Sequence, residues 1–173
     1  PGKFINAIQT YIPGDFQTAE ILLDPRNKAG YIWVFPHKYM ASIGAGGVGI
    51  TFVALRRILD DFLASRGLAA PAYSAGMINY NDRGYRFGNI FLIGEAAGFT
   101  SGLSGEGIYY ALVSGREAAR EIIKGAESKK LERMRRKLRR DRRLLLLVWL
   151  LFSLRLGPVV MWLMRRKYED RKK

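Results

Sequence analysis

Four short runs rich in β-branched and aromatic residues follow one another at the start of the chain, with only a few residues between them. Parallel neighbours in a sheet need a crossover of about a dozen residues or more, which these connections cannot supply. The sequence therefore predicts an antiparallel sheet. The runs are Lys3–Pro13, Thr18–Leu23, Gly30–Pro36 and Met40–Gly44.

An amphipathic helix is predicted directly after the fourth run. Thr51 suits the N-cap, apolar residues recur at spacings of three and four from Phe52 to Phe62, and Gly67 ends the pattern. We therefore expect residues 1–80 to form an antiparallel-sheet region with one helix over 51–66.

A glycine-rich segment, residues 94–107, joins a predicted short buried strand (Asn89–Ile93) to a predicted helix from near Gly105 to Lys124. Such a turn exposes backbone N–H groups, and the helix start adds unpaired amides and a positive dipole end. Together they can cradle an anionic or electron-rich ligand. From the residues alone, a tight connection whose glycines serve only packing is the alternative. This unit spans residues 81–127.

The segment GNIFLIGEAAGFTSGLSGEGIYYALVSGREAA, residues 88–119, resembles the second FAD-contact motif of the flavoprotein family that includes geranylgeranyl reductases. The resemblance implies FAD as the cofactor, with the loop and the following helix N-terminus against the isoalloxazine. Glu95 stands where aspartate is commoner, and Gly102 where proline is frequent. The implied cofactor-binding residues are Gly94, Glu95, Ala96, Ala97, Gly98, Gly102, Leu103, Gly105, Glu106, Gly107 and Ile108.

A second motif, YIWVFP at residues 31–36 followed by seven residues and Gly-Ala-Gly, is similar to a signature of the same family. Alternate residues of a strand share one face, so three aromatic rings should form one wall, which suits a long apolar chain with π bonds. An ordinary aromatic core face is the alternative. The implied substrate-binding residues are Tyr31, Trp33, Phe35, Pro36, Gly44 and Gly46.

Gly44, Gly46 and Gly49 also spell G-x-G-x-x-G between a predicted strand and a predicted helix, which is the dinucleotide-binding fingerprint. That fingerprint expects a first parallel strand and an acidic residue about 20 positions further on. The preceding runs are antiparallel, and residues 65–70 contain no acid. A Rossmann site here is the weaker interpretation.

Composition limits the chemistry that the side chains can supply. The chain has no cysteine and one histidine, His37, so we expect no metal site and no Cys/His nucleophile pair. Redox chemistry would need an organic cofactor. No catalytic residue can be named; Glu106 and Tyr109 could lie near the flavin, although pairing with the helix dipole explains Glu106 equally well.

The resemblance covers about residues 3–125, which correspond to the C-terminal portion of the family's fold; the N-terminal dinucleotide-binding half is absent from this chain. It implies an α/β (α+β) protein that reduces C=C bonds of an isoprenoid lipid, with a nicotinamide or a ferredoxin as possible electron donors. This chain alone is expected to be an incomplete enzyme.

The last 46 residues, 128–173, form a basic and apolar helical tail. They carry 17 Lys and Arg against four acids, whereas residues 1–127 carry 12 against 11. Leu144–Met164 is long enough to cross a bilayer, but Arg155 and the Gly157-Pro158 break interrupt it. We expect a cytoplasmic protein bound peripherally to an anionic membrane.

The alternative function is a non-catalytic module whose tail binds a membrane surface or nucleic acid. Nucleic acid is the weaker choice, because aromatic residues do not interleave with the cations of this tail.

Overall fold

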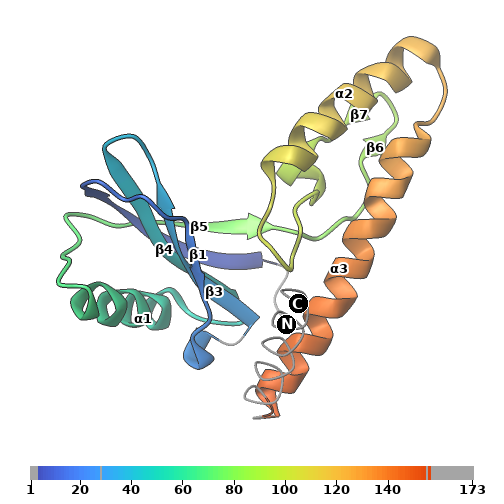
Figure 1. Cartoon of the computed structure of the whole chain (residues 1–173). Coiled ribbons are helices and arrows are strands. Elements are labelled where there is room, and N and C mark those ends of the chain that lie inside the picture. The colour runs from blue at the N-terminus through green and yellow to red at the C-terminus, as the bar shows by residue number, and fades with distance from the viewer. Residues whose placement is uncertain (1–3, 28, 155, 157–173) are drawn as a thin grey trace, which may run out of the picture. The chain divides into compact units, whose positions relative to one another are not determined.

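The computed structural model describes residues 4–27, 29–154 and 156 and divides them into two compact units. The first unit contains residues 6–76 and the described residues from Leu146; the second contains residues 4–5 and 77–145. The elements, in chain order, are β1 (Phe4–Pro13), β2 (Glu20–Leu22), η1 (Pro25–Asn27), β3 (Ala29–Pro36), β4 (Met40–Val48), α1 (Phe52–Ser65), β5 (Ser74–Asn79), β6 (Arg86–Phe87), β7 (Ile90–Phe91), η2 (Gly94–Ala97), α2 (Ile108–Lys124) and α3 (Lys129–Ser153) (Figure 1).

The predicted antiparallel sheet is confirmed, with strand order β2-β3-β4-β1-β5. β2 pairs with β3 and β3 with β4 in antiparallel register, so that Trp33 lies opposite Gly44 and Tyr31 opposite Gly46. All four predicted runs are strands, although Lys3 lies outside the described residues. β4 is longer than predicted, because its small residues continue the pairing with β3 as far as Val48.

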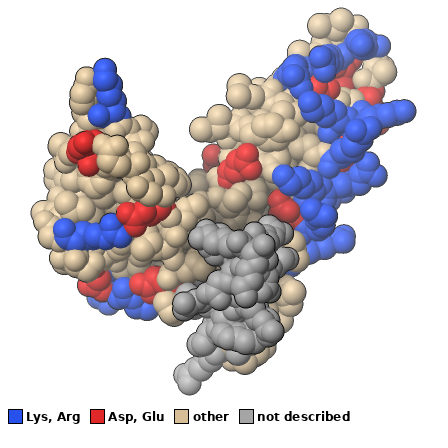
Figure 2. Space-filling model, in the orientation of Figure 1, with Lys and Arg blue, Asp and Glu red and all other residues tan. Residues whose placement is uncertain are grey.

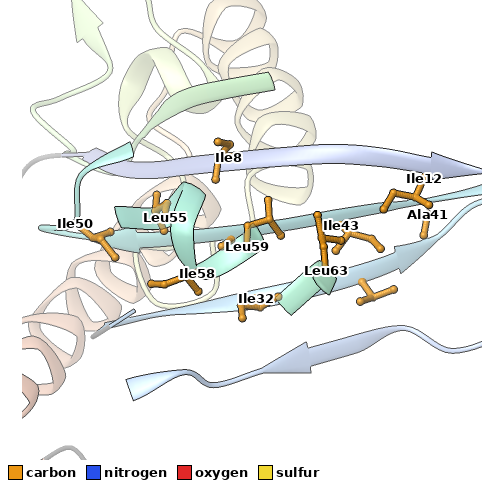
Figure 3. Packing of buried hydrophobic residues seen from close by; sticks show 12 residues of the cluster. Ile8, Ile12, Ile32, Ala41, Ile43, Ile50, Leu55, Ile58, Leu59 and Leu63 are labelled. Atoms are coloured by element: carbon orange, nitrogen blue, oxygen red, sulfur yellow. The ribbon is translucent and has the colours of Figure 1, made fainter. Parts of the chain in front are cut away.

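Helix α1 covers one face of this sheet (Figure 3). Thr51 is its N-cap, as predicted, and the Thr51 hydroxyl accepts a hydrogen bond from the Ala54 amide at 3.2 Å. Gly67, with φ of 66°, follows the C-cap residue, which confirms the predicted end. The core between helix and sheet is aliphatic, and its buried side chains include Ile8, Ile12, Ile32, Val34, Ile43, Leu55, Ile58, Leu59 and Leu63.

Residues 70–93 differ from the sequence analysis in one strand that was not predicted and one that was predicted wrongly. The sequence did not indicate β5, whose segment contains Gly76 and shows no apolar alternation. The predicted buried strand Asn89–Ile93 is only the two-residue β7, which pairs with β6 in a separate ribbon and leaves Ile90 63% exposed. A two-residue strand of a ribbon is not covered on both faces, so an apolar composition did not mean burial here.

In the second unit, α2 and α3 are joined by a buried network of carboxylates. The Ser128 amide donates to Glu121 at 2.7 Å, and the Ser128 hydroxyl donates to Glu117 at 2.8 Å. Tyr85 donates its phenol proton to Glu121 at 3.0 Å, and burial together with this carboxylate raises the pKa of Tyr85 to about 12. The Ser128 hydroxyl in turn accepts from the Leu131 amide at 3.3 Å, so Ser128 caps the start of α3, and the two acids lie where the helix dipole favours negative charge.

α2 ends at Lys124 as predicted, and Gly125 caps it in the left-handed conformation. Its start was predicted near Gly105, but the regular helix begins at Ile108. α3 continues from the basic segment through Leu144–Phe152 without a break. No helix among the described residues is long and apolar enough to span a bilayer. Arg155 and residues 157–164 of the predicted apolar segment lie outside the described residues.

A buried ion pair fixes α3 against the segment before β6. Arg135 donates two hydrogen bonds to Asp82, each of 3.1 Å, and their side chains are 14% and 6% exposed. Burial opposes ionisation of Asp82, but the hydrogen bonds from Arg135 and from the Gly84 amide outweigh it, so the pKa of Asp82 is lowered. Because the pKa of Asp82 is lower in the folded state than in the unfolded state, its carboxylate stabilises the folded protein at pH values above the unfolded-state pKa. This contribution is lost as the pH falls through the folded-state pKa.

We predict that Asp82→Asn lowers the free energy of unfolding by about 3 kcal/mol at neutral pH, because it removes the buried carboxylate that Arg135 and Arg139 share and leaves Arg135 paired only with the more exposed Glu132. Urea denaturation followed by circular dichroism measures this. As the pH falls below the ordinary aspartate pKa of 3.8, the difference between variant and parent should shrink.

The matched control is Asp61→Asn, which breaks the exposed pair with Arg26 and should cost less than about 1 kcal/mol. Equal losses for the two variants would contradict a special role for the buried pair.

Candidate functional site: a glycine-rich loop and an aromatic strand

The three rings predicted to share a face do so on β3. Tyr31 and Trp33 meet edge to face, Trp33 and Phe35 are stacked, and both pairs of ring centroids are 6.1 Å apart. Ile32 and Val34, which alternate with them, belong to the core beneath α1. The aromatic ladder (Tyr31, Trp33 and Phe35) therefore lies on the sheet face opposite α1.

Glycines in β4 make room for the central ring of this ladder. A Cβ on Gly44 would lie 2.3 Å from Cζ2 of Trp33 and 2.6 Å from the Ile8 carbonyl, and a Cβ on Gly46 would lie 3.5 Å from Cζ3 of Trp33. The indole thus lies across the backbone of β4. This contact explains the spacing between the aromatic motif and the two glycines.

A polar row borders the ladder on the same face. The Trp33 indole N–H donates to the Ser42 hydroxyl at 3.2 Å, and Ser42 donates to the side-chain carbonyl of Gln9 at 3.0 Å. These bonds hold the indole in one orientation. Pro36 ends β3 at the hairpin, where the His37 amide donates to the Met40 carbonyl.

The dinucleotide fingerprint is not a phosphate turn. Gly44 and Gly46 lie inside an antiparallel strand and are paired with β3, and only Gly49 lies beyond β4, with φ of 69°. The Rossmann interpretation of these glycines is therefore wrong.

The glycine-rich loop is held against α2 at Gly94. The Gly94 amide donates to the Ser114 hydroxyl at 2.9 Å, and a Cβ at Gly94 would lie 2.9 Å from Cβ of Ala111. Gly94 has φ of 54°, a conformation that side chains disfavour. The contact with Ala111 and the backbone conformation therefore both disfavour any residue with a Cβ at position 94.

Other small residues of the loop serve packing within the second unit. Gly98 is left-handed, and a Cβ there would lie 2.4 Å from the Asn81 backbone. A Cβ on Gly102 would meet the Tyr80 ring at 2.9 Å and Leu145 at 3.0 Å. Ala97 is buried in the core of this unit. These three predicted cofactor-binding residues, Ala97, Gly98 and Gly102, are therefore small because they pack closely against other parts of the second unit.

The remaining predicted residues lie nearer the surface. Gly105 and Gly107 are half-buried, and the exposed residues are Glu95, Ala96, Leu103, Glu106 and Ile108. The N-cap residues of η2 and α2, Ile93 and Gly107, supply no side-chain hydrogen bond, although the Gly94 amide at the start of η2 is bonded to Ser114. The loop thus leads into the start of α2, whose first backbone N–H groups have no capping side chain.

These residues fit the polar edge of a flavin. Uncapped amides at the start of α2 can donate to ring carbonyl and nitrogen atoms. Thr100 adds a second indication: its hydroxyl is buried, has no hydrogen-bond partner among the described residues, and lies 3.5 Å from the Cβ position of Gly107 at the α2 N-cap.

Glu95 makes a contact that sequence analysis missed. Its carboxylate accepts a hydrogen bond from the Asn79 amide at 3.0 Å, and the Asn79 side chain donates to the Glu95 carbonyl at 3.0 Å. Glu95 therefore joins the end of β5 to η2. Nothing in the sequence near Asn79 indicates this pairing.

Glu106 lies just before the α2 N-cap, Gly107, and not in the first turn of the helix. Its amide and carbonyl close the loop, since the Ser101 amide donates to the Glu106 carbonyl at 2.9 Å. Thr100 was not singled out from the sequence, although it is a polar residue within the glycine-rich segment.

Comparisons with known proteins confirm the resemblance to geranylgeranyl reductases. The chain is 32% identical over 108 residues to the chloroplastic geranylgeranyl diphosphate reductase of Arabidopsis thaliana, covering 58% of this chain and 22% of that protein. It is 31% identical over 109 residues to the digeranylgeranylglycerophospholipid reductase of Methanococcus vannielii, covering 58% of this chain and 28% of that protein. No family model matches the chain.

Among solved structures, the chain is similar to a geranylgeranyl bacteriochlorophyll reductase-like protein from Thermoplasma acidophilum. The TM-score is 0.64 at 27% identity, over 87% of this chain and 43% of that one. The chain thus spans about a quarter of the length of these curated relatives and less than half of the solved structure. The comparisons favour the reductase interpretation over a non-catalytic binding module.

We predict that Gly94→Ala weakens the second unit more than Gly88→Ala does. Both glycines have positive φ, but a Cβ at Gly88 meets nothing within 4 Å, whereas one at Gly94 meets Ala111. The backbone strain of about 1 kcal/mol is common to both, so overpacking against α2 should add about 1–2 kcal/mol at Gly94 alone. Urea midpoints of the two variants give the difference, and identical midpoints would refute the close approach.

Proposed function

We propose that this chain, related to geranylgeranyl reductases over more than half of its length, forms part of a flavin-dependent oxidoreductase that reduces C=C bonds of an isoprenoid chain. FAD is the flavin that the loop motif implies. The observation that carries the proposal is the uncapped start of α2, which follows the glycine-rich loop in a chain related to these reductases.

The exposed backbone at Glu95 and Ala96 and the first amides of α2, from Ile108 onward, would hold the polar edge of the cofactor. α2 is a helix of 17 residues, so its dipole places partial positive charge at this end. Positive charge there stabilises negative charge that develops on a reduced ring. The buried Thr100 hydroxyl lies beneath the same helix start and can donate one further hydrogen bond.

The aromatic ladder supports an isoprenoid as the substrate. Isoprenoid chains are long, apolar and unsaturated, and a row of indole and phenyl faces offers them dispersion and π contacts. The Ser42 and Gln9 bonds fix the indole before any ligand arrives, which lowers the ordering cost of binding. Burial raises the pKa of Tyr31, so its phenol stays neutral at neutral pH.

When bound, a reduced flavin supplies a hydride equivalent to one carbon of the double bond, and the other carbon takes up a proton. The chain's own contribution is to bind the ring through the loop amides and to bind the apolar chain through the ladder.

The test uses the protein in the form its gene encodes. It should purify with, or take up, FAD and show the visible absorbance of a bound flavin. After anaerobic reduction it should add two hydrogens per double bond to geranylgeranyl diphosphate, as read by mass spectrometry. A protein that stays colourless with excess FAD would contradict the proposal.

We predict that Trp33→Ala raises KM for the geranylgeranyl substrate about 10- to 100-fold, because it removes the central ring of the ladder. Flavin absorbance should be unchanged. Trp33→Phe keeps an aromatic face and should recover most of the loss. Steady-state kinetics of both variants measure this, and a KM unaffected by Trp33→Ala would remove the ladder from the substrate site.

A further inference from the structure

α3 carries one continuous stripe of exposed residues that changes from basic to apolar along the helix. The positions alternate at spacings of four and three, so they share one side of the helix. All eight are exposed. The stripe, called here the outward stripe, consists of Lys129, Arg133, Arg136, Arg140, Arg143, Leu147, Leu150 and Leu154. Leu154 lies just past α3, but its amide donates to the Leu150 carbonyl in helical register.

The opposite side of the basic half of α3 is buried in the second unit. Leu131, Met134, Leu138, Asp141 and Leu145 recur there at spacings of three and four. The helix is thus anchored by one side, and the outward stripe is not needed for that packing.

The cations of α3 are sorted in the same way. Several of those nearer the packed side have partners: Arg135 and Arg139 bind Asp82, and Lys137 donates to the Tyr110 hydroxyl at 3.0 Å. None of the five cations of the outward stripe forms an ion pair with a described residue. Figure 2 shows how Lys and Arg gather along this helix.

From these observations we propose that the outward stripe docks the protein on the surface of an anionic phospholipid bilayer. The five cations extend over about 21 Å, enough to contact several head groups. The three leucines extend over about 10 Å of the helix axis, far short of a bilayer span of about 30 Å, so the helix lies along the interface with its leucine side chains in the acyl boundary.

The leucines distinguish a bilayer from nucleic acid. Both partners attract cations, but only a bilayer places an apolar layer next to its charged surface. A helix that lies along the surface can place the Arg143 side chain among the head groups and the Leu147 side chain in the acyl boundary beneath them. A nucleic-acid surface would leave the leucines in water and would favour aromatic residues among the cations. The inference does not depend on the flavin function.

The experiment is co-sedimentation of the full protein with vesicles of phosphatidylcholine alone and with an equal mixture of phosphatidylcholine and phosphatidylglycerol. Binding should require phosphatidylglycerol and weaken with salt. The triple variant Arg136→Gln, Arg140→Gln, Arg143→Gln should lower the partition coefficient about a hundredfold, from about a fivefold loss per cation.

A matched control removes three exposed cations elsewhere: Arg57→Gln, Arg83→Gln, Lys124→Gln. It makes the same change in net charge and should bind nearly as the parent does. Leu147→Ser with Leu154→Ser should reduce binding at least tenfold while the dependence on phosphatidylglycerol remains. Circular dichroism of each variant verifies the fold.

Three outcomes would overturn the inference. Equal losses in the triple variant and its control would show that only net charge matters. Equal binding to neutral vesicles would remove the role of the cations. Stripping of the protein from vesicles by RNA at equal phosphate concentration, with RNA binding unaffected by the leucine variant, would assign the surface to nucleic acid.

Discussion

The close approach of α2 to the glycine-rich loop at Gly94 is the constraint on which the candidate flavin site depends. The Gly94 amide is bonded to Ser114, and no Cβ fits between residue 94 and Ala111. The loop that leaves Gly94 returns to start α2 at Ile108, so one contact brings the starts of η2 and α2 to the same part of the second unit. Amides that have no capping side chain then remain for a ligand.

In the sheet of the first unit, glycines that reduce stability make room for an aromatic side chain. Glycines weaken a strand interior, because they pack no side chain and lose more backbone entropy on folding. At Gly44 and Gly46 this loss admits the indole of Trp33 across β4. The other face of the same strands is filled with aliphatic side chains beneath α1. One face of the sheet therefore packs the core, and the other carries aromatic rings that fit because Gly44 and Gly46 have no side chains.

Much of the fold of the first unit could be predicted from the sequence, because it depends on interactions between residues that are close in the chain. Short connections imply antiparallel pairing, Thr51 and Gly67 mark the ends of α1, and alternation places the ladder on one face. Long-range packing could not be predicted. Asn79 binds Glu95, and Gly102 faces Tyr80, only because distant segments meet. The sequence also gave no sign that β7 would be short and exposed.

Hydrogen–deuterium exchange of the protein, with and without FAD, tests the central claim most directly, because it reads the backbone amides themselves. We expect slower exchange on FAD addition in peptides covering residues 94–111, and no change in peptides covering α1, which covers the sheet face opposite the aromatic ladder. Protection confined to other segments, or unchanged exchange at residues 94–111 in a protein that demonstrably holds FAD, would contradict the account.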